Sequence, residues 1–314
     1  MSNRFTQLRV IFGLALLCAL VWWVDPARLV ATLGRMDGGY LLICLLSLTL
    51  TVLLGAFNLN LLISRSGELP FSRFLPVYWT GWAFSLVVPG QVGDMVSLPV
   101  LLRRHGFSWQ SSLGRTLVDK LLSLLVMGLF GLWGLLSFVN AHLEGTGTAL
   151  WVLTVVAVLI GMPAAFAALP RQGHTRLARL RRALVETGME ARETLRANPG
   201  RVMVNFALTW LKVMVTGVAF WAMFRALGQH QVDVLQVIPL MAASSLVAYL
   251  PISFNGLGTV ELAGIILFSS LGMDESTIVT AYLALRATNI TLAWLPASLW
   301  LSLNATNNEQ RERS

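Results

Sequence analysis

Six apolar runs dominate this 314-residue chain, and each is long enough, or nearly so, to cross a bilayer's hydrocarbon core of ~30 Å as a helix. Hydrophobic residues make up 56% of the chain and charged residues 12%, about half the charged fraction of a soluble domain. The runs are continuous rather than alternating, which excludes a β-barrel. The sequence therefore predicts a single all-α polytopic membrane domain over residues 1–314. The expected spans are Leu8–Val24, Tyr40–Ile63, Leu117–Val139, Ala149–Leu169, Val202–Phe224 and Ile278–Leu303.

Two further apolar segments, Phe74–Lys120 and Val237–Arg286, are interrupted in the same way. Each has a proline near its start, a Pro/Gly break in its middle, a later glycine, and a basic residue 14 positions after that glycine. Broken apolar segments at corresponding places in two halves of a chain are typical of a transporter's binding site. The residues expected to form the breaks are Pro89, Gly90 and Gly93 in the first segment, and Pro251, Gly256 and Gly258 in the second.

The distribution of basic residues predicts how these segments cross the membrane. The loop Pro170–Arg201 holds eight arginines against three glutamates, so the positive-inside rule places it in the cytoplasm. Arg103 and Arg104 also belong inside, and Phe74–Leu102 must then leave on the face where it enters. The same logic applies to Val234–Leu271 on the opposite face. We therefore expect six full spans plus two re-entrant helical hairpins.

These elements form an inverted repeat, with span, hairpin and span in each half. The first repeat covers about 40–139 and the second about 202–303, followed by a polar tail over 304–314. The loop between them, about 170–201, has the spacing of an amphipathic helix on the inner membrane surface. Eight full spans are the alternative, and they place the charged loops less well. Both termini are expected in the cytoplasm.

No catalytic motif is visible in the sequence. It contains no P-loop, no H-E-x-x-H, no G-x-S-x-G and no D-x-D, and its His and Cys residues are not clustered. We therefore expect no enzyme activity, no cofactor and no metal site. The net charge of +8 lies mostly in one loop between spans, so it indicates membrane orientation rather than nucleic-acid binding.

Polar residues at membrane depth are costly, so they are the candidate functional residues. We expect Asp94 or Asp119 to pair with Lys120 or Lys212, and Glu261 to pair with Arg286. Such pairs either hold a broken helix in place or bind a phosphate or carboxylate headgroup, and the two roles are compatible. The full candidate set for headgroup binding is Asp94, Arg115, Asp119, Lys120, Lys212, Asn255, Glu261, Arg286 and Asn289.

The two broken segments resemble a known family. The run VVPGQVGDMVSLPVLLRRHGFSWQSSLGRTLVDKLLSLL is similar to the first signature of the lysylphosphatidylglycerol synthase transmembrane region, and PISFNGLGTVELAGIILFSSLG to its second. Asp119-Lys120 departs from the Glu-Arg expected there, and lysine makes poorer bidentate contacts with phosphate. The resemblance implies a bacterial-type inner-membrane protein with a lipid-accessible cavity. Larger relatives carry a soluble synthase domain, and the resemblance leads us to expect a standalone member without it.

Three functions follow for comparison. The first is a flippase or transporter that moves a phospholipid or polyprenyl-linked lipid between leaflets. The second is a membrane-embedded transferase acting on lipid-linked sugars. The third is a non-transporting partner of a lipid-modifying enzyme. The expected partners are membrane lipids with anionic or phosphate-bearing headgroups, and a homodimer is a further possibility that the resemblance raises.

Overall fold

A computed structural model of the chain describes residues 33–64, 69–86, 93–142, 176–249 and 253–313, with a few isolated positions before residue 33. Helices dominate these ranges, and no strand occurs in them. The expected span Ala149–Leu169, nearly all of Leu8–Val24, and the expected break residues Pro89, Gly90 and Pro251 lie outside the described residues. The side chain of Asp94 lies outside them as well.

Four long helices form the frame of the molecule: α3 (Gly38–Ile63), α6 (Trp109–His142), α9 (Pro199–Ala226) and α12 (Glu275–Arg313). Each is long and apolar enough to cross a membrane, which confirms four of the expected spans. All four extend past the apolar runs that predicted them, and two do so by several residues. Helix α6 begins at Trp109 rather than Leu117, and α12 continues through the polar tail. A helix needs only its backbone hydrogen bonds, so the end of an apolar run marks the membrane edge and not the helix end.

Four short helices form two hairpins between the long ones. The first joins α4 (Phe71–Ser85) to α5 (Gly93–Arg103), and the second joins α10 (Val234–Leu246) to α11 (Thr259–Phe268). The four helices have 15, 11, 13 and 10 residues, which is about 15–23 Å each at a rise of 1.5 Å per residue. None of these arms spans ~30 Å alone. The second hairpin also contains the short 3₁₀ turns η1 (Val247–Tyr249) and η2 (Phe254–Gly256), and η3 (Ser269–Leu271) follows it.

Glycine and serine hold the arms of the first hairpin close together. The Ser97 hydroxyl of α5 donates to the Gly81 carbonyl of α4 at 2.8 Å. A Cβ at Gly81 would lie 3.2 Å from the Leu98 side chain, and one at Gly93 would lie 2.6 Å from Ser85 Cα. Larger residues would therefore separate α4 from α5.

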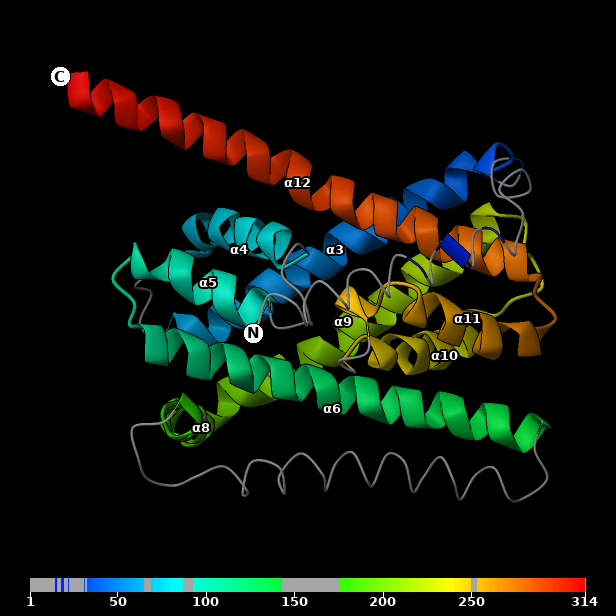
Figure 1. Cartoon of the computed structure of the whole chain (residues 1–314), viewed down its shortest axis with the longest axis horizontal. Coiled ribbons are helices and arrows are strands. Elements are labelled where there is room, and N and C mark those ends of the chain that lie inside the picture. Colours follow the sequence, from blue (N-terminus) through cyan, green and yellow to red (C-terminus); the bar gives the residue numbers. More distant parts are fainter. Residues whose placement is uncertain are drawn as a thin grey trace.

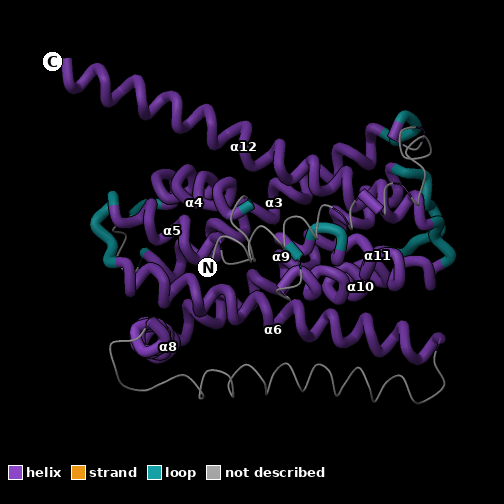
Figure 2. The backbone as a smooth tube through the Cα atoms, viewed as in Figure 1, coloured by secondary structure: helices purple, strands orange, loops and turns teal. Residues whose placement is uncertain are grey.

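The two hairpins occupy equivalent places in the fold. Their open ends lie at opposite ends of the long axis, with α3 and α9 crossing between them (Figures 1 and 2). Helix α4 packs against α12, and α10 packs against α6, so each hairpin contacts the last long helix of the other half. Exchanging α3–α6 for α9–α12 leaves this set of neighbours unchanged. Among the described helices, α3–α6 and α9–α12 therefore have matching sets of neighbours.

Helices α3 and α9 form the antiparallel pair at the centre of the fold. At one end the backbone N–H of Asp37 donates to the Ala226 carbonyl at 2.8 Å. In the middle the hydroxyls of Thr51 and Thr216 lie 3.3 Å apart. At the other end Arg201 donates to the Ser64 carbonyl at 2.9 Å, which satisfies the end of α3. The pair is therefore fixed along its whole length.

The arginine-rich loop contains helix α8 (Arg176–Ala197), which confirms the helix expected there. It crosses the start of α6, where Gly114 lies against Glu190 and Ala191. An open hollow of about 920 Å³ lies at this crossing. It shares no lining residue with the interior polar residues described below. Its lining residues are Ser108, Gln110, Glu186, Met189, Glu190, Arg192, Glu193, Arg196 and Ala197.

Substitution of Gly134 tests the packing of the second hairpin on α6. A Cβ at Gly134 would overlap the backbone of Pro239 and lie 3.0 Å from the backbone nitrogen of Leu240, and neither can rotate away. We expect Gly134→Ala to destabilise the protein by about 1–3 kcal/mol through overpacking. The measurement is the thermal unfolding midpoint of the purified protein in detergent.

The matched control is Gly128→Ala, six positions earlier on the same helix. A Cβ at Gly128 meets no atom within 4 Å, and alanine has the higher helix propensity, so this variant should unfold at or slightly above the wild-type midpoint. Equal midpoints for the two variants would contradict the close contact between α6 and α10.

Candidate functional site

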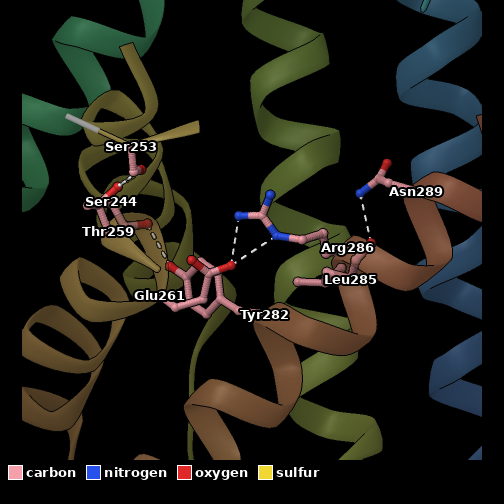
Figure 3. A network of polar contacts seen from close by, with 8 residues as sticks. All are labelled: Ser244, Ser253, Thr259, Glu261, Tyr282, Leu285, Arg286 and Asn289. Atoms are coloured by element: carbon pink, nitrogen blue, oxygen red, sulfur yellow. Dashed lines mark hydrogen bonds and ion pairs between the residues drawn. The ribbon is translucent and has the colours of Figure 1, made fainter. Parts of the chain in front are cut away.

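The strongest polar contact in the interior joins the second hairpin to the last long helix. Arg286 of α12 donates to Glu261 Oε1 of α11 from Nη2 at 2.7 Å and from Nε at 3.0 Å. The Glu261 side chain is 0% exposed and that of Arg286 is 28% exposed. Figure 3 shows the remaining guanidinium nitrogen of Arg286 directed away from Glu261. The expected ion pair between these residues is confirmed.

The second carboxylate oxygen of Glu261 is unsatisfied. Oε2 is buried and has no hydrogen-bond partner among the residues that the structure describes. Both donating nitrogens of Arg286 converge on Oε1, so the guanidinium and the carboxylate do not meet fork to fork as in the strongest Arg–carboxylate pairs. The hydrogen bonds between the two residues therefore leave out Glu261 Oε2 and one terminal nitrogen of Arg286.

Close packing of α11 on α12 buries Glu261. Gly264 lies against the ring of Tyr282, where any Cβ would overlap the ring atoms. The hydroxyl of Tyr282 lies 2.6 Å from the Ser244 hydroxyl of α10, and those of Ser253 and Thr259 lie 2.9 Å apart (Figure 3). The carboxylate is thus enclosed by α10, α11 and α12.

The break between α10 and α11 depends on three residues with positive φ. Asn255 has φ 50°, Gly256 has φ 72° and Gly258 has φ 78°. Glycine adopts this region without steric cost, and asparagine is the next most tolerant residue. Gly258 caps α11, whose first turn carries Glu261. The expected break residues Gly256 and Gly258 therefore set the direction in which α11 starts.

A second polar cluster joins the three helices α3, α6 and α9. Asp119 Oδ1 accepts from the amide of Asn205 at 2.9 Å and from that of Asn58 at 3.2 Å. Asn58 also donates to the Thr209 hydroxyl at 2.8 Å, and Asn205 donates to the Asn58 carbonyl at 3.1 Å. Asn58, Asn205 and Thr209 are 0% exposed. This cluster holds the frame helices together with neutral amides around one carboxylate.

The described contacts of Lys212, Lys120 and Arg115 do not include Asp119, and the expected pairing of a lysine with Asp94 lies outside the described residues. Lys212 of α9 donates to the Ser123 hydroxyl of α6 at 3.1 Å, and the Lys120 ammonium lies 5.3 Å from the centroid of the Tyr249 ring. Arg115 donates to the carbonyl of Ile63, at the C-terminal end of α3. Among the described residues Asp119 forms no ion pair with Lys120 or Lys212. Its negative charge is instead met by the amides of Asn58 and Asn205, which belong to helices remote in sequence.

The structure brings together some of the candidate residues and separates others. The side-chain amide of Asn289 donates to the Leu285 carbonyl of its own helix at 2.9 Å (Figure 3). Sequence reasoning did not assign roles to the hydroxyl partners Ser123, Ser244 and Tyr282, or to the Tyr249 ring that faces Lys120. Asn58 and Asn205 did carry a signal, because an amide inside an apolar run needs a partner.

The arrangement presents cations to an anion at two places near the break of the second hairpin, Lys120 beside Tyr249 and Arg286 beside Glu261. In the described part of the chain, no three His, Cys, Asp or Glu side chains come together as metal ligands would.

Comparison with known proteins identifies one family. A profile described as the lysylphosphatidylglycerol synthase TM region matches residues 10–297. Comparison with curated proteins finds no match.

Proposed function

The chain belongs to the family of the lysylphosphatidylglycerol synthase transmembrane region, and from this premise we propose that it moves a phosphate-bearing lipid between the two leaflets of its membrane. The family is linked to lipid metabolism or lipid flipping, and its membrane region is commonly non-catalytic. The chain is a multi-pass membrane protein. In the proposed role, a phospholipid or polyprenyl-linked lipid passes along the two hairpins without chemical change.

The observation that carries the proposal is the reciprocal packing of the hairpins, α4 on α12 and α10 on α6. Two units with the same neighbours, entered from opposite ends, support an inverted repeat with re-entrant hairpins. Transporters with this plan alternate access by moving one unit against the other around a site near the midplane. The short arms of both hairpins agree with segments that turn back inside the membrane.

The charged residues support a phosphate-bearing headgroup as the moving group. Lys120 and Arg286 each lie 14 residues after the glycine that follows a hairpin, so they occupy equivalent places in the two units. Arg286 keeps part of its side chain exposed, and its guanidinium has a nitrogen directed away from Glu261. A planar guanidinium matches phosphate geometry, and Lys120 supplies a second positive charge. Among the candidate residues, these two are the proposed headgroup contacts.

The test is lipid movement in vesicles that contain the purified protein. We expect faster transfer of a labelled phospholipid or polyprenyl phosphate between leaflets than in protein-free vesicles. Lys120→Ala and Arg286→Ala should each slow this transfer at least about tenfold, the effect of losing one charged hydrogen bond. Arg286→Lys should retain part of the rate if charge alone suffices.

Arg192→Ala is the matched control, because it removes an exposed arginine on α8, away from both hairpins. Its rate should equal that of the wild type. Folding of every variant is checked by its elution from a sizing column. Wild-type rates in folded Lys120→Ala and Arg286→Ala would contradict the headgroup assignment, and the absence of transfer with all tested lipids would contradict the transport function.

A further inference from the structure

Glu261 is a buried charged group whose described hydrogen bonds the proposed transport would remove. Its side chain is fully buried, Oε1 accepts from both donating nitrogens of Arg286, and Oε2 has no partner in the described part of the chain. If an anion takes Arg286, Glu261 loses its described donors in one step. A buried carboxylate without a cation or a donor is strongly disfavoured, and the usual outcome is neutralisation by a proton.

We propose that Glu261 takes up one proton when a phosphate-class anion binds Arg286, so that anion and proton occupy the site together. This inference rests on the proposed function and adds the coupled ion to it. The shared ligand chemistry is a phosphate group, from a lipid headgroup or from free phosphate.

The charge balance of the exchange favours this coupling. In the observed state the Glu261 carboxylate and the Arg286 guanidinium cancel. Arrival of a phosphodiester monoanion at Arg286 would leave one uncompensated negative charge in the interior. A proton from water forms an O–H bond at Oε2 or Oε1 and restores neutrality. When the anion leaves, that proton returns to water and the carboxylate pairs with Arg286 again.

The titratable groups on the elements packed around Glu261 indicate that Glu261 itself takes the proton. Helix α12 presents Tyr282 and Arg286, and η1 presents Tyr249, whose ring faces Lys120. Helix α10 and turn η3 contain no Asp, Glu, His, Lys or Arg. Glu275 lies in the first turn of α12, three turns before Arg286. The described elements packed on α11 therefore bring a cation and neutral hydroxyls to Glu261, and no second carboxylate.

The experiment measures proton uptake on binding by calorimetry in two buffers with different ionisation heats. The protein is held in nanodiscs of zwitterionic lipid, and the probes are inorganic phosphate and a short-chain phosphatidylglycerol. The phosphodiester does not titrate near neutral pH, so its arm reports protons taken up by the protein alone. We expect about one proton per bound anion, and affinity that falls up to about tenfold for each unit rise in pH. Binding of phosphatidylglycerol alone identifies a lipid headgroup site, and binding of both probes identifies a general phosphate site.

Glu261→Gln is the decisive variant, because glutamine imitates the protonated acid and cannot titrate. It should bind the phosphodiester with no proton uptake and without the pH dependence. Glu275→Gln removes another glutamate on the neighbouring helix and should keep both properties.

Three results would overturn the inference. They are binding to wild type without proton uptake, unchanged uptake in Glu261→Gln, and no binding of either probe. Lipid transfer that proceeds without proton uptake would overturn the coupling and leave the transport function standing. Proton-coupled binding without lipid transfer would overturn the transport function and leave the coupling standing.

Discussion

Arg286→Met is expected to lower the free energy of unfolding by about 3–5 kcal/mol, the cost of removing one partner from a buried ion pair. Methionine keeps much of the volume of the side chain and removes the two donors that reach Glu261 Oε1 at 2.7 and 3.0 Å. The remaining carboxylate is 0% exposed and already has one unsatisfied oxygen. The measurement is unfolding by an anionic detergent in mixed micelles, followed by circular dichroism.

Substitution of the other partner, Glu261, should lower the free energy of unfolding by less, because the two partners are buried to different extents. Glu261→Gln leaves Arg286 with 28% of its side chain exposed, so the guanidinium can reach water or lipid headgroups. The double variant should be more stable than Arg286→Met alone, since no buried charge remains in it. This non-additivity is the signature of direct coupling between two residues.

Arg104→Met provides the control for this series. Arg104 follows the end of α5 and is exposed, so its loss should change stability by less than about 0.5 kcal/mol. An Arg286→Met variant as stable as Arg104→Met would show that the ion pair between Glu261 and Arg286 does not stabilise the fold. The exchange of Arg286 between Glu261 and a headgroup would then need no compensating proton.

The sequence predicts the frame and the second hairpin because their signals are local. Apolar runs mark α3, α6, α9 and α12, and the glycines at 256 and 258 mark the turn before α11. Glu261 and Arg286 lie on consecutive helices joined by a short connection, and each is a charge inside an apolar run. Their pairing could therefore be inferred without knowing any other part of the fold.

The partners of Asp119 could not be inferred in this way. A carboxylate at membrane depth predicts a cation, and Lys120 is its neighbour in sequence. In the helix, however, consecutive residues point about 100° apart, so Asp119 faces α3 and α9 while Lys120 faces Tyr249. The amides of Asn58 and Asn205 reach Asp119 through the antiparallel register of α3 and α9, which no local pattern encodes. Arg115 is similar, since its acceptor is a backbone carbonyl at the end of another helix.

Asp119→Leu should lower the free energy of unfolding by about 2–4 kcal/mol, because two amides lose their shared acceptor in the interior. Asn58 would keep its bond to Thr209, and Asn205 would keep its bond to the Asn58 carbonyl, so the cluster would be weakened at its centre rather than abolished. The same unfolding measurement in mixed micelles applies. The expected cost exceeds a single interhelical hydrogen bond, which is worth about 0.6–2 kcal/mol in membranes.

Asp119→Asn is the matched control, because it keeps a side-chain oxygen in the position of Oδ1 and removes the charge. If the cluster depends on an acceptor for two amides, this variant should lose less than about 1 kcal/mol. If Asp119 were instead held by a cation, asparagine would cost as much as leucine. Asn205→Leu should add little to Asp119→Leu, since both remove the 2.9 Å bond between α6 and α9. Additive losses of stability in the double variant would mean that Asp119 and Asn205 stabilise the frame independently of each other.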